Sequence, residues 1–393
     1  MKRLKNEINS LVNRGVDRHL RLAVTGLSRS GKTAFITAMV NQLLNLHAGA
    51  RLPLLSAVRE ERLLGVKRVP QRDFGIPRFT YDEGLAQLYG DPPTWPTPTR
   101  GVSEIRLALR FRSNESLMRH FKDTSTLYLE IVDYPGEWLL DLPMLAQDYL
   151  SWSRQMTGLL QGQRAGWSAK WRQLCEGLDP LAPADENRLA AIAEAWTAYL
   201  HQCKQEGLHF IQPGRFVLPG DLAGAPALQF FPWPNVDGVG ESKLAQADRH
   251  TNAGMLRERY NYYCEKVVKG FYKNHFLRFD RQIVLVDCLQ PLNSGPQAFN
   301  DMRLALTQLM QSFHYGQRTL FRRLFSPVID KLLFAATKAD HVTVDQHSNM
   351  VSLLQQLIQD AWQNAAFEGI SMDCLGLAAI QATRSGIIEV NGE

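Results

Sequence analysis

The hydrophobic and polar positions of this chain follow two periods, one typical of strands and one typical of helices. Strand-like runs occupy residues 20–25, 104–111, 126–132, 282–288, 331–336 and 374–382. Apolar residues at helical spacing occupy residues 34–46, 298–313 and 349–367. Strands that alternate with helices predict an α/β fold whose mostly parallel sheet is flanked by helices.

The pattern changes between residues 139 and 276, where helical spacing prevails. Residues 144–175 and 187–205 are its clearest helical segments, and the block is rich in tryptophan and poor in β-branched runs. We therefore predict two units. One is an α/β domain formed by residues 1–138 and 277–393, and the other is a mainly helical insertion over residues 139–276.

Composition narrows the class of protein without fixing its function. The chain has 393 residues, of which 45% are hydrophobic, and a net charge of +5, which is too weak to imply nucleic acid as a partner. Five cysteines without C-x-x-C spacing suggest buried thiols in a reducing compartment. No apolar run is long enough to span a bilayer, so we expect a cytoplasmic protein. Residues 1–13 form a short amphipathic stripe that either packs on the domain or lies at the inner membrane surface.

The first motif is a phosphate-binding loop at residues 26–33. The sequence Gly-Leu-Ser-Arg-Ser-Gly-Lys-Thr fits G-x-x-x-x-G-K-T, with a strand before it and a helix after it. Lys32 would reach the β- and γ-phosphates of a nucleotide, and the Thr33 hydroxyl would bind Mg²⁺. The residues expected to contact the nucleotide here are Gly26, Ser28, Arg29, Ser30, Gly31, Lys32, Thr33 and Ala34.

The second motif is D-x-x-G, with Asp133 and Gly136 at the end of a strand-like run. The Asp133 carboxylate would hold Mg²⁺ through a water molecule, and the Gly136 N–H would contact the γ-phosphate. Aspartate and glycine are common in turns, so the pattern gains its weight from its position after the second strand that follows the loop.

The third motif is Thr337-Lys338-Ala339-Asp340, also at the end of a strand-like run. It is similar to the guanine-reading box N-K-x-D, with Thr337 in place of asparagine. The Asp340 carboxylate would accept hydrogen bonds from the N1–H and 2-amino groups of guanine, which adenine does not offer. The Lys338 stem would lie over the base. After the last strand-like run, Ala382, Thr383 and Arg384 form either a loop that donates a backbone N–H to the guanine carbonyl or an ordinary surface loop.

These motifs, in this order, resemble a Ras-like GTPase domain, and in detail they resemble the YcjX family of P-loop GTPases. The resemblance implies binding of GTP and GDP, a requirement for Mg²⁺, slow hydrolysis of GTP, and a role in the stress response of bacteria. It also implies a Ras-like domain that carries a large helical insertion. Because that insertion follows Gly136, we expect the segment after Gly136 to move it when the nucleotide changes.

A GTPase needs a switch threonine that binds Mg²⁺, and residues 47–100, which we expect to be rich in loops, offer two. Residues 99–104 are similar to the T-T-G-[IV]-x-E segment of heterotrimeric Gα subunits, which favours Thr99 as a metal ligand over the alternative Thr97. Arg100 or Arg29 would supply positive charge in the transition state, unless both are solvated surface residues.

Glu137 lies where many GTPases carry the glutamine that orients the attacking water. A carboxylate can accept a proton from water, but it adds negative charge beside a phosphate, so we predict slow turnover. Two rival functions stay open. An ATP-using enzyme such as a kinase would prefer adenine, and a nucleotide-ordered scaffold would bind GTP without turnover. In each case we expect an effector protein, with the membrane surface as one place to meet it.

Overall fold

Seven strands form one mixed sheet in the computed structural model, which describes residues 18–46, 52, 55–112, 124–315, 329, 331–359, 362–363 and 371–383. The strands are β1 Arg18–Gly26, β2 Leu63–Arg68, β3 Ser103–Arg112, β4 Thr124–Asp133, β5 Arg281–Val286, β6 Lys331–Ala336 and β7 Ser371–Gly376. Their order is β2-β3-β4-β1-β5-β6-β7. The pairs β2–β3 and β3–β4 are antiparallel, whereas β4, β1, β5, β6 and β7 run parallel.

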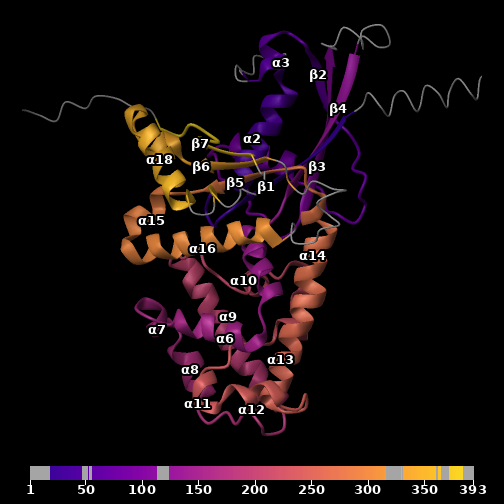
Figure 1. Cartoon of the computed structure of the whole chain (residues 1–393). Helices are drawn as coiled ribbons and strands as arrows, with labels where there is room; N and C mark the ends of the chain where they lie inside the picture. The colour runs from indigo at the N-terminus through magenta and orange to yellow at the C-terminus, as the bar shows by residue number, and fades with distance from the viewer. Residues whose placement is uncertain are drawn as a thin grey trace, which may run out of the picture.

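Both faces of the sheet are buried, which explains why its central strands are continuous apolar runs. Neighbouring residues of a strand point to opposite faces. Val24, Ile131 and Leu285 pack with the buried side of α2 (Lys32–Leu44), whereas Ala23 and Val132 belong to the larger core on the other face. Helix α16 (Pro296–Tyr315) contributes Met302 and Leu306 to that larger core and lies between the sheet and the helices of the segment that joins β4 to β5 (Figure 1).

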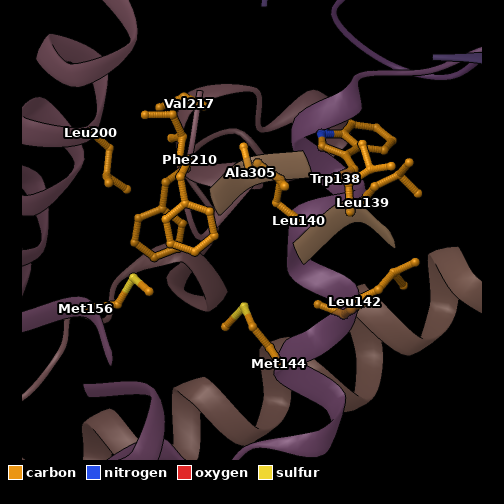
Figure 2. Close-up of a cluster of buried hydrophobic side chains, with 14 of the residues drawn as sticks. Trp138, Leu139, Leu140, Leu142, Met144, Met156, Leu200, Phe210, Val217 and Ala305 are labelled. Carbon is orange, nitrogen blue, oxygen red and sulfur yellow. The ribbon is translucent and has the colours of Figure 1, made fainter. Parts of the chain in front are cut away.

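The segment between β4 and β5 contains helices and no strand. These elements form the lower part of the molecule as drawn in Figure 1. They are η2 Gly136–Ala146, α6 Tyr149–Gly158, α7 Gln163–Trp167, α8 Ala169–Cys175, α9 Glu186–Gln205, α10 Gly214–Val217, η3 Gly220–Leu222, η4 Pro226–Leu228, α11 Val236–Val239, α12 Glu241–Gln246, α13 Asn252–Tyr262, a π-helix at Tyr263–Val268, α14 Lys269–Asn274 and η6 Phe276–Arg278. Figure 2 shows Leu140, Met144 and Phe210 inside their common core. This core is continuous with the lower face of the sheet, because Val132 and Ala305 belong to the same cluster.

The remaining helices are α3 Ser56–Arg59, α4 Tyr81–Leu88, α15 Leu289–Ser294 and α18 His347–Leu357, and short 3₁₀ turns cover Ala339–His341 and Val344–Gln346. No helix in the described part of the chain has the length and apolar character needed to cross a membrane. Four of the five cysteines are buried, as predicted for thiols, and Cys374 is partly exposed.

Several sequence-based boundaries were wrong. Residues 47–100 contain β2 and α4 as well as loops. The strand β2 was missed because it is a half-buried edge strand whose apolar residues do not alternate regularly with polar ones. The predicted helix 144–175 is a 3₁₀ segment followed by α6, α7 and α8, because extended backbone at residue 147 and turns near residues 160 and 168 interrupt it. The last strand covers residues 371–376, not 374–382, because Leu377 turns away to bond Ala336 O and Ala339 N. The predicted helix at residues 1–13 lies outside the described residues.

Candidate functional site

A tight loop joins β1 to α2 at the carboxyl end of the central strands. Gly31 has φ of 77° and Arg29 has φ of 64°, and the loop closes through a hydrogen bond from Ser30 N to Leu27 O at 3.2 Å. A left-handed conformation costs an L-residue free energy, and glycine adopts it most easily, which accounts for the second glycine of the motif. Gly26 is needed for space, since an added Cβ would lie 3.0 Å from Leu285 O.

The amino end of α2 offers unsatisfied donors. Phe35 N bonds Gly31 O at 2.9 Å, and no side chain caps the helix at Gly31. The N–H groups of Lys32, Thr33 and Ala34 therefore have no acceptor within the helix. Together with the helix dipole they make this end a favourable place for an anion such as phosphate.

Four predicted side chains converge beside this loop. Lys32 Nζ lies 2.6 Å from Asp133 Oδ1 and donates to Tyr134 O at 2.6 Å. The Thr99 hydroxyl donates to Asp133 Oδ2 and lies 3.3 Å from the Thr33 hydroxyl. Asp133 is 1% exposed, so its charge is balanced inside the protein by the Lys32 ammonium.

The sheet explains this convergence. β1 and β4 are parallel neighbours, with Val24 opposite Asp133, so the loop after β1 and the motif after β4 leave the sheet at the same edge. Thr99 lies shortly before β3, whose Ser103 pairs with Asp133. The strands that follow β1 along the chain are added to the sheet on both sides of β1. Ligands of open α/β sheets bind where the strand order changes direction in this way.

Gly136 lies directly against the loop of residues 26–33. An added Cβ there would stand 2.3 Å from Gly26 O, so only glycine permits this approach. The neighbouring Tyr134 anchors the motif under the sheet: its ring stacks on Phe279 at 5.5 Å, its hydroxyl accepts a bond from Gln282, and burial raises its pKa well above normal.

Glu137 meets a residue that sequence reasoning missed. Lys204, in the last turn of α9, places its Nζ 2.7 Å from Glu137 Oε1. The next residue of α9, Gln205, accepts a hydrogen bond at its carbonyl from Arg29 Nη2 at 2.9 Å. Arg29 therefore contacts α9, and no local signal in the sequence links Lys204 to residues so far away along the chain.

The two candidate switch threonines have different hydrogen-bond partners in the structure. Thr99 reaches Asp133, whereas Thr97 bonds Gln87 through both its N–H and its hydroxyl at 3.0 Å. Arg100 is exposed, and no hydrogen bond or ion pair joins its side chain to the described residues of the cluster. Ser28 is partly exposed within the loop.

The third motif forms a second group at the carboxyl end of β6. Thr337 N bonds Val286 O at 2.9 Å, which ties β6 to β5. Lys338 has φ of 61°, and its Nζ lies 2.5 Å from Asp287 Oδ2. The Asp340 carboxylate accepts a bond from Ala382 N at 3.0 Å, and the Thr383 hydroxyl donates to Asp340 O.

Asp287 was missed by the sequence reasoning, although an acidic residue directly after a buried strand was an available signal. Its other oxygen, Oδ1, accepts bonds from Leu289 N at 3.1 Å and Gln290 N at 3.2 Å. The structure thus brings Asp340 together with Ala382 and Thr383, and Arg384 lies outside the described residues.

The residues near Asp133 fit Mg²⁺. Two hydroxyls and one carboxylate meet there, and Mg²⁺ prefers oxygen ligands. In the described ranges no set of three or more His, Cys, Asp and Glu residues is grouped to bind a metal. The donor set at Thr33, Thr99 and Asp133 therefore suits a small hard cation rather than zinc.

The sheet order and this loop place the chain in the class of mixed α/β proteins with a mostly parallel sheet and a glycine-rich turn before a helix. The chain belongs to the YcjX-like family, DUF463, whose pattern matches residues 20–393. It is 92% identical over 393 residues to "Ras-like GTPase YcjX" of Escherichia coli (strain K12). The match covers 100% of this chain and 84% of that protein. It is 47% identical over 396 residues to "Ras-like GTPase YcjX" of Shewanella oneidensis, with 98% of this chain and 82% of that protein covered. The family predicted from the motifs is therefore confirmed.

Proposed function

We propose that this protein binds GTP with Mg²⁺ and hydrolyses it slowly to GDP, acting as a nucleotide-dependent switch. The observation that carries the proposal is the meeting of Lys32, Thr99 and Asp133 beside a helix terminus with free N–H groups. The names of both relatives, Ras-like GTPase, support the same activity.

Each group has a distinct task at the phosphates. The N–H groups of residues 31–34 bind phosphate oxygens, and Lys32 neutralises the charge of the β- and γ-phosphates. Thr33, Thr99 and Asp133 would hold Mg²⁺, which would supply further positive charge to the phosphates. The Gly136 N–H is close enough to the loop to contact a γ-phosphate, because its backbone touches Gly26.

Guanine is read by Asp340. Its carboxylate accepts two donors that only guanine presents, while Lys338 lies along the base and the residue 382–384 loop donates to the guanine carbonyl. Support comes from the bond between Ala382 N and Asp340 Oδ2, which places the two predicted base-reading loops side by side.

Hydrolysis is slow because its acid–base machinery is incomplete. The reaction joins a water oxygen to the γ-phosphorus and breaks the bond to the bridging oxygen of GDP. Glu137, the residue expected to orient that water, is engaged by Lys204 at 2.7 Å. Arg100, a candidate for the positive charge in the transition state, is exposed.

We further propose a division into a GTPase domain of residues 1–138 and 277–393 and a helical insertion of residues 139–276. Contacts support a coupling between them. Trp138 lies under the Arg215 guanidinium at 3.3 Å, and an added Cβ at Gly214 would lie 2.2 Å from Glu137 O. The partner of the insertion is an effector protein. A role in bacterial stress is a proposal that rests on the family resemblance, and a place at the inner membrane is one that rests on the amphipathic pattern of residues 1–13.

Equilibrium titration with fluorescent GTP, GDP and ATP analogues, with Mg²⁺, tests this function on the wild type and on Asp340→Ala. We expect a strong preference for guanine that the substitution removes. Equal or tighter binding of ATP, unchanged by the substitution, would restore the ATP-using alternative. Guanine binding without any release of phosphate would leave a nucleotide-ordered scaffold.

A further inference from the structure

The carboxyl end of α9 is built into the nucleotide site. The carbonyls of residues 202, 203 and 204 accept backbone N–H groups from residues 206, 208 and 207. The carbonyl of Gln205 accepts the Arg29 guanidinium at 2.9 Å instead. The last carbonyls of a helix have no partner within the helix, and that of Gln205 is satisfied by a residue of the phosphate-binding loop.

The preceding residue, Lys204, forms a largely buried ion pair with Glu137. Their side chains are 24% and 9% exposed, and the Nζ–Oε1 distance is 2.7 Å. Lys204 is the one cation that pairs with Glu137 among the residues the structure describes. An enclosed carboxylate that loses such a partner keeps a charge that the protein cannot balance.

Glu137 stands close to where a third phosphate would bind. It directly follows Gly136, whose backbone packs on Gly26 of the loop. GTP carries more negative charge than GDP, and the extra charge is on the γ-phosphate. An unbalanced carboxylate at Glu137 would repel that group more than it repels the α- and β-phosphates, because Coulomb repulsion falls with distance.

We propose that Lys204 is a positioning residue that balances the charge of Glu137 and thereby lets the site accept a triphosphate. The inference rests on the proposed function, since it concerns the same site. Lys204 acts from the helical segment, so α9 contacts the residue whose environment differs between GTP and GDP. Its contribution is selective: it supports binding of GTP and leaves binding of GDP nearly unchanged.

The test measures dissociation constants for GDP and for a non-hydrolysable GTP analogue, both fluorescent and with Mg²⁺. We expect Lys204→Met to weaken binding of the GTP analogue on the order of tenfold relative to binding of GDP, because the uncompensated charge of Glu137 repels the γ-phosphate. Lys204→Arg keeps the positive charge, so we expect it to keep the wild-type ratio of the dissociation constants for the GTP analogue and GDP. Adding Glu137→Gln to Lys204→Met removes the repelling charge and restores the ratio. Lys170→Met, an exposed lysine of α8, is the matched control.

The outcomes separate the two proposals. Failure of the wild type to bind guanine nucleotides would overturn the proposed function itself. Normal GTP binding with an unchanged GTP-to-GDP ratio in Lys204→Met would overturn the role of Lys204 alone. Equal weakening of both nucleotides, without rescue by Glu137→Gln, would assign Lys204 a merely structural role and also overturn it. Thermal unfolding checks each variant, and Lys204→Gln repeats the measurement if Lys204→Met does not fold.

Discussion

Lys32, the first residue of α2, and Asp133, the last residue of β4, form an ion pair of 2.6 Å, with the Asp133 side chain 1% exposed. The pair joins the loop after β1 to the motif after β4, so each residue sets the charge around the other. Removing either one leaves an uncompensated charge in a buried place, at a cost of about 3–5 kcal/mol.

Asp133→Asn is therefore expected to weaken binding of Mg²⁺ and GTP together, and thermal unfolding checks that the variant still folds. The amide keeps the shape, but its single oxygen can accept from Thr99 or from Lys32 and not from both, and it lacks the charge that attracts a cation. We expect the affinity gained on adding Mg²⁺ to shrink by roughly tenfold or more, as for loss of one charged hydrogen bond. Titrations with Mg²⁺ and with EDTA measure this, and Asp237→Asn, in the exposed pair with Arg154, is the control.

Thr99→Ala and Thr97→Ala distinguish the two switch candidates. Thr99 contacts Asp133 and Thr33, whereas Thr97 bonds Gln87 on α4. Only Thr99→Ala should reduce the Mg²⁺-dependent affinity for a GTP analogue. The opposite ranking would assign the metal-binding role to Thr97.

Gly136→Ala is expected to abolish nucleotide binding through sterics alone. Its Cβ would stand 2.3 Å from Gly26 O, so the loop or the motif must shift away from the phosphate position. We expect a loss of stability of about 1–3 kcal/mol, as for other overpacked sites. Gly166→Ala, where an added Cβ meets nothing within 4 Å, is the matched control for both binding and thermal unfolding.

The sequence predicted correctly those features that residues close together along the chain determine, and it missed those that depend on distant contacts. The strand 331–336 was predicted with its observed bounds, because Leu332, Phe334 and Ala336 are buried in a continuous apolar run. The loop 26–33 was predictable because its glycines, lysine and threonine act within one turn. Edge strand β2 was missed because tertiary pairing with β3, not its own weak pattern, makes it a strand.

The missed site residues depend on distant contacts. Asp287 and Lys338 are 51 residues apart along the chain, and they meet because β5 and β6 are parallel neighbours. Lys204 reaches Glu137 only because α9 ends against the phosphate-binding loop. A sequence pattern carries no record of such packing. The sequence therefore suggested an unpaired carboxylate at Glu137, whereas the structure pairs it with Lys204.

A buried ion pair between Arg164 and Asp301 fastens α16 to the helical segment. Arg164 Nη2 lies 2.6 Å from Asp301 Oδ1, while Asp301 Oδ2 accepts His209 N and Phe210 N at 2.5 and 2.9 Å. Asp301→Ala removes all three partners at once and should cost about 3–5 kcal/mol of unfolding free energy in denaturant titration. Glu265→Ala breaks the exposed pair with Lys269 and should leave the unfolding free energy nearly unchanged, because solvent screens this pair. Similar losses for the two variants would show that the Arg164 pair does not hold the helices together.

The stability of the protein should also depend on one buried carboxyl group, Asp141. It accepts bonds from Gly214 N at 2.8 Å and from the Tyr263 hydroxyl at 2.5 Å. Burial raises the pKa of Asp141 from 3.8 to about 7, against the opposing effect of these hydrogen bonds. The folded state therefore binds this proton more tightly than the unfolded state does. Its contribution to stability is complete below about pH 4 and is lost as the pH rises through about 7.

Asp141→Asn, which mimics the protonated side chain, isolates this contribution from other titrating groups. A pKa shift of this size corresponds to roughly 4 kcal/mol at most. The wild type should lose stability relative to Asp141→Asn between pH 5 and pH 7, and the difference should level off above pH 8. Denaturant unfolding at several pH values measures both proteins, with Asp221→Asn, an exposed carboxylate, as the control. Parallel pH profiles for the wild type and Asp141→Asn would mean that Asp141 is ionised in the folded protein throughout this range.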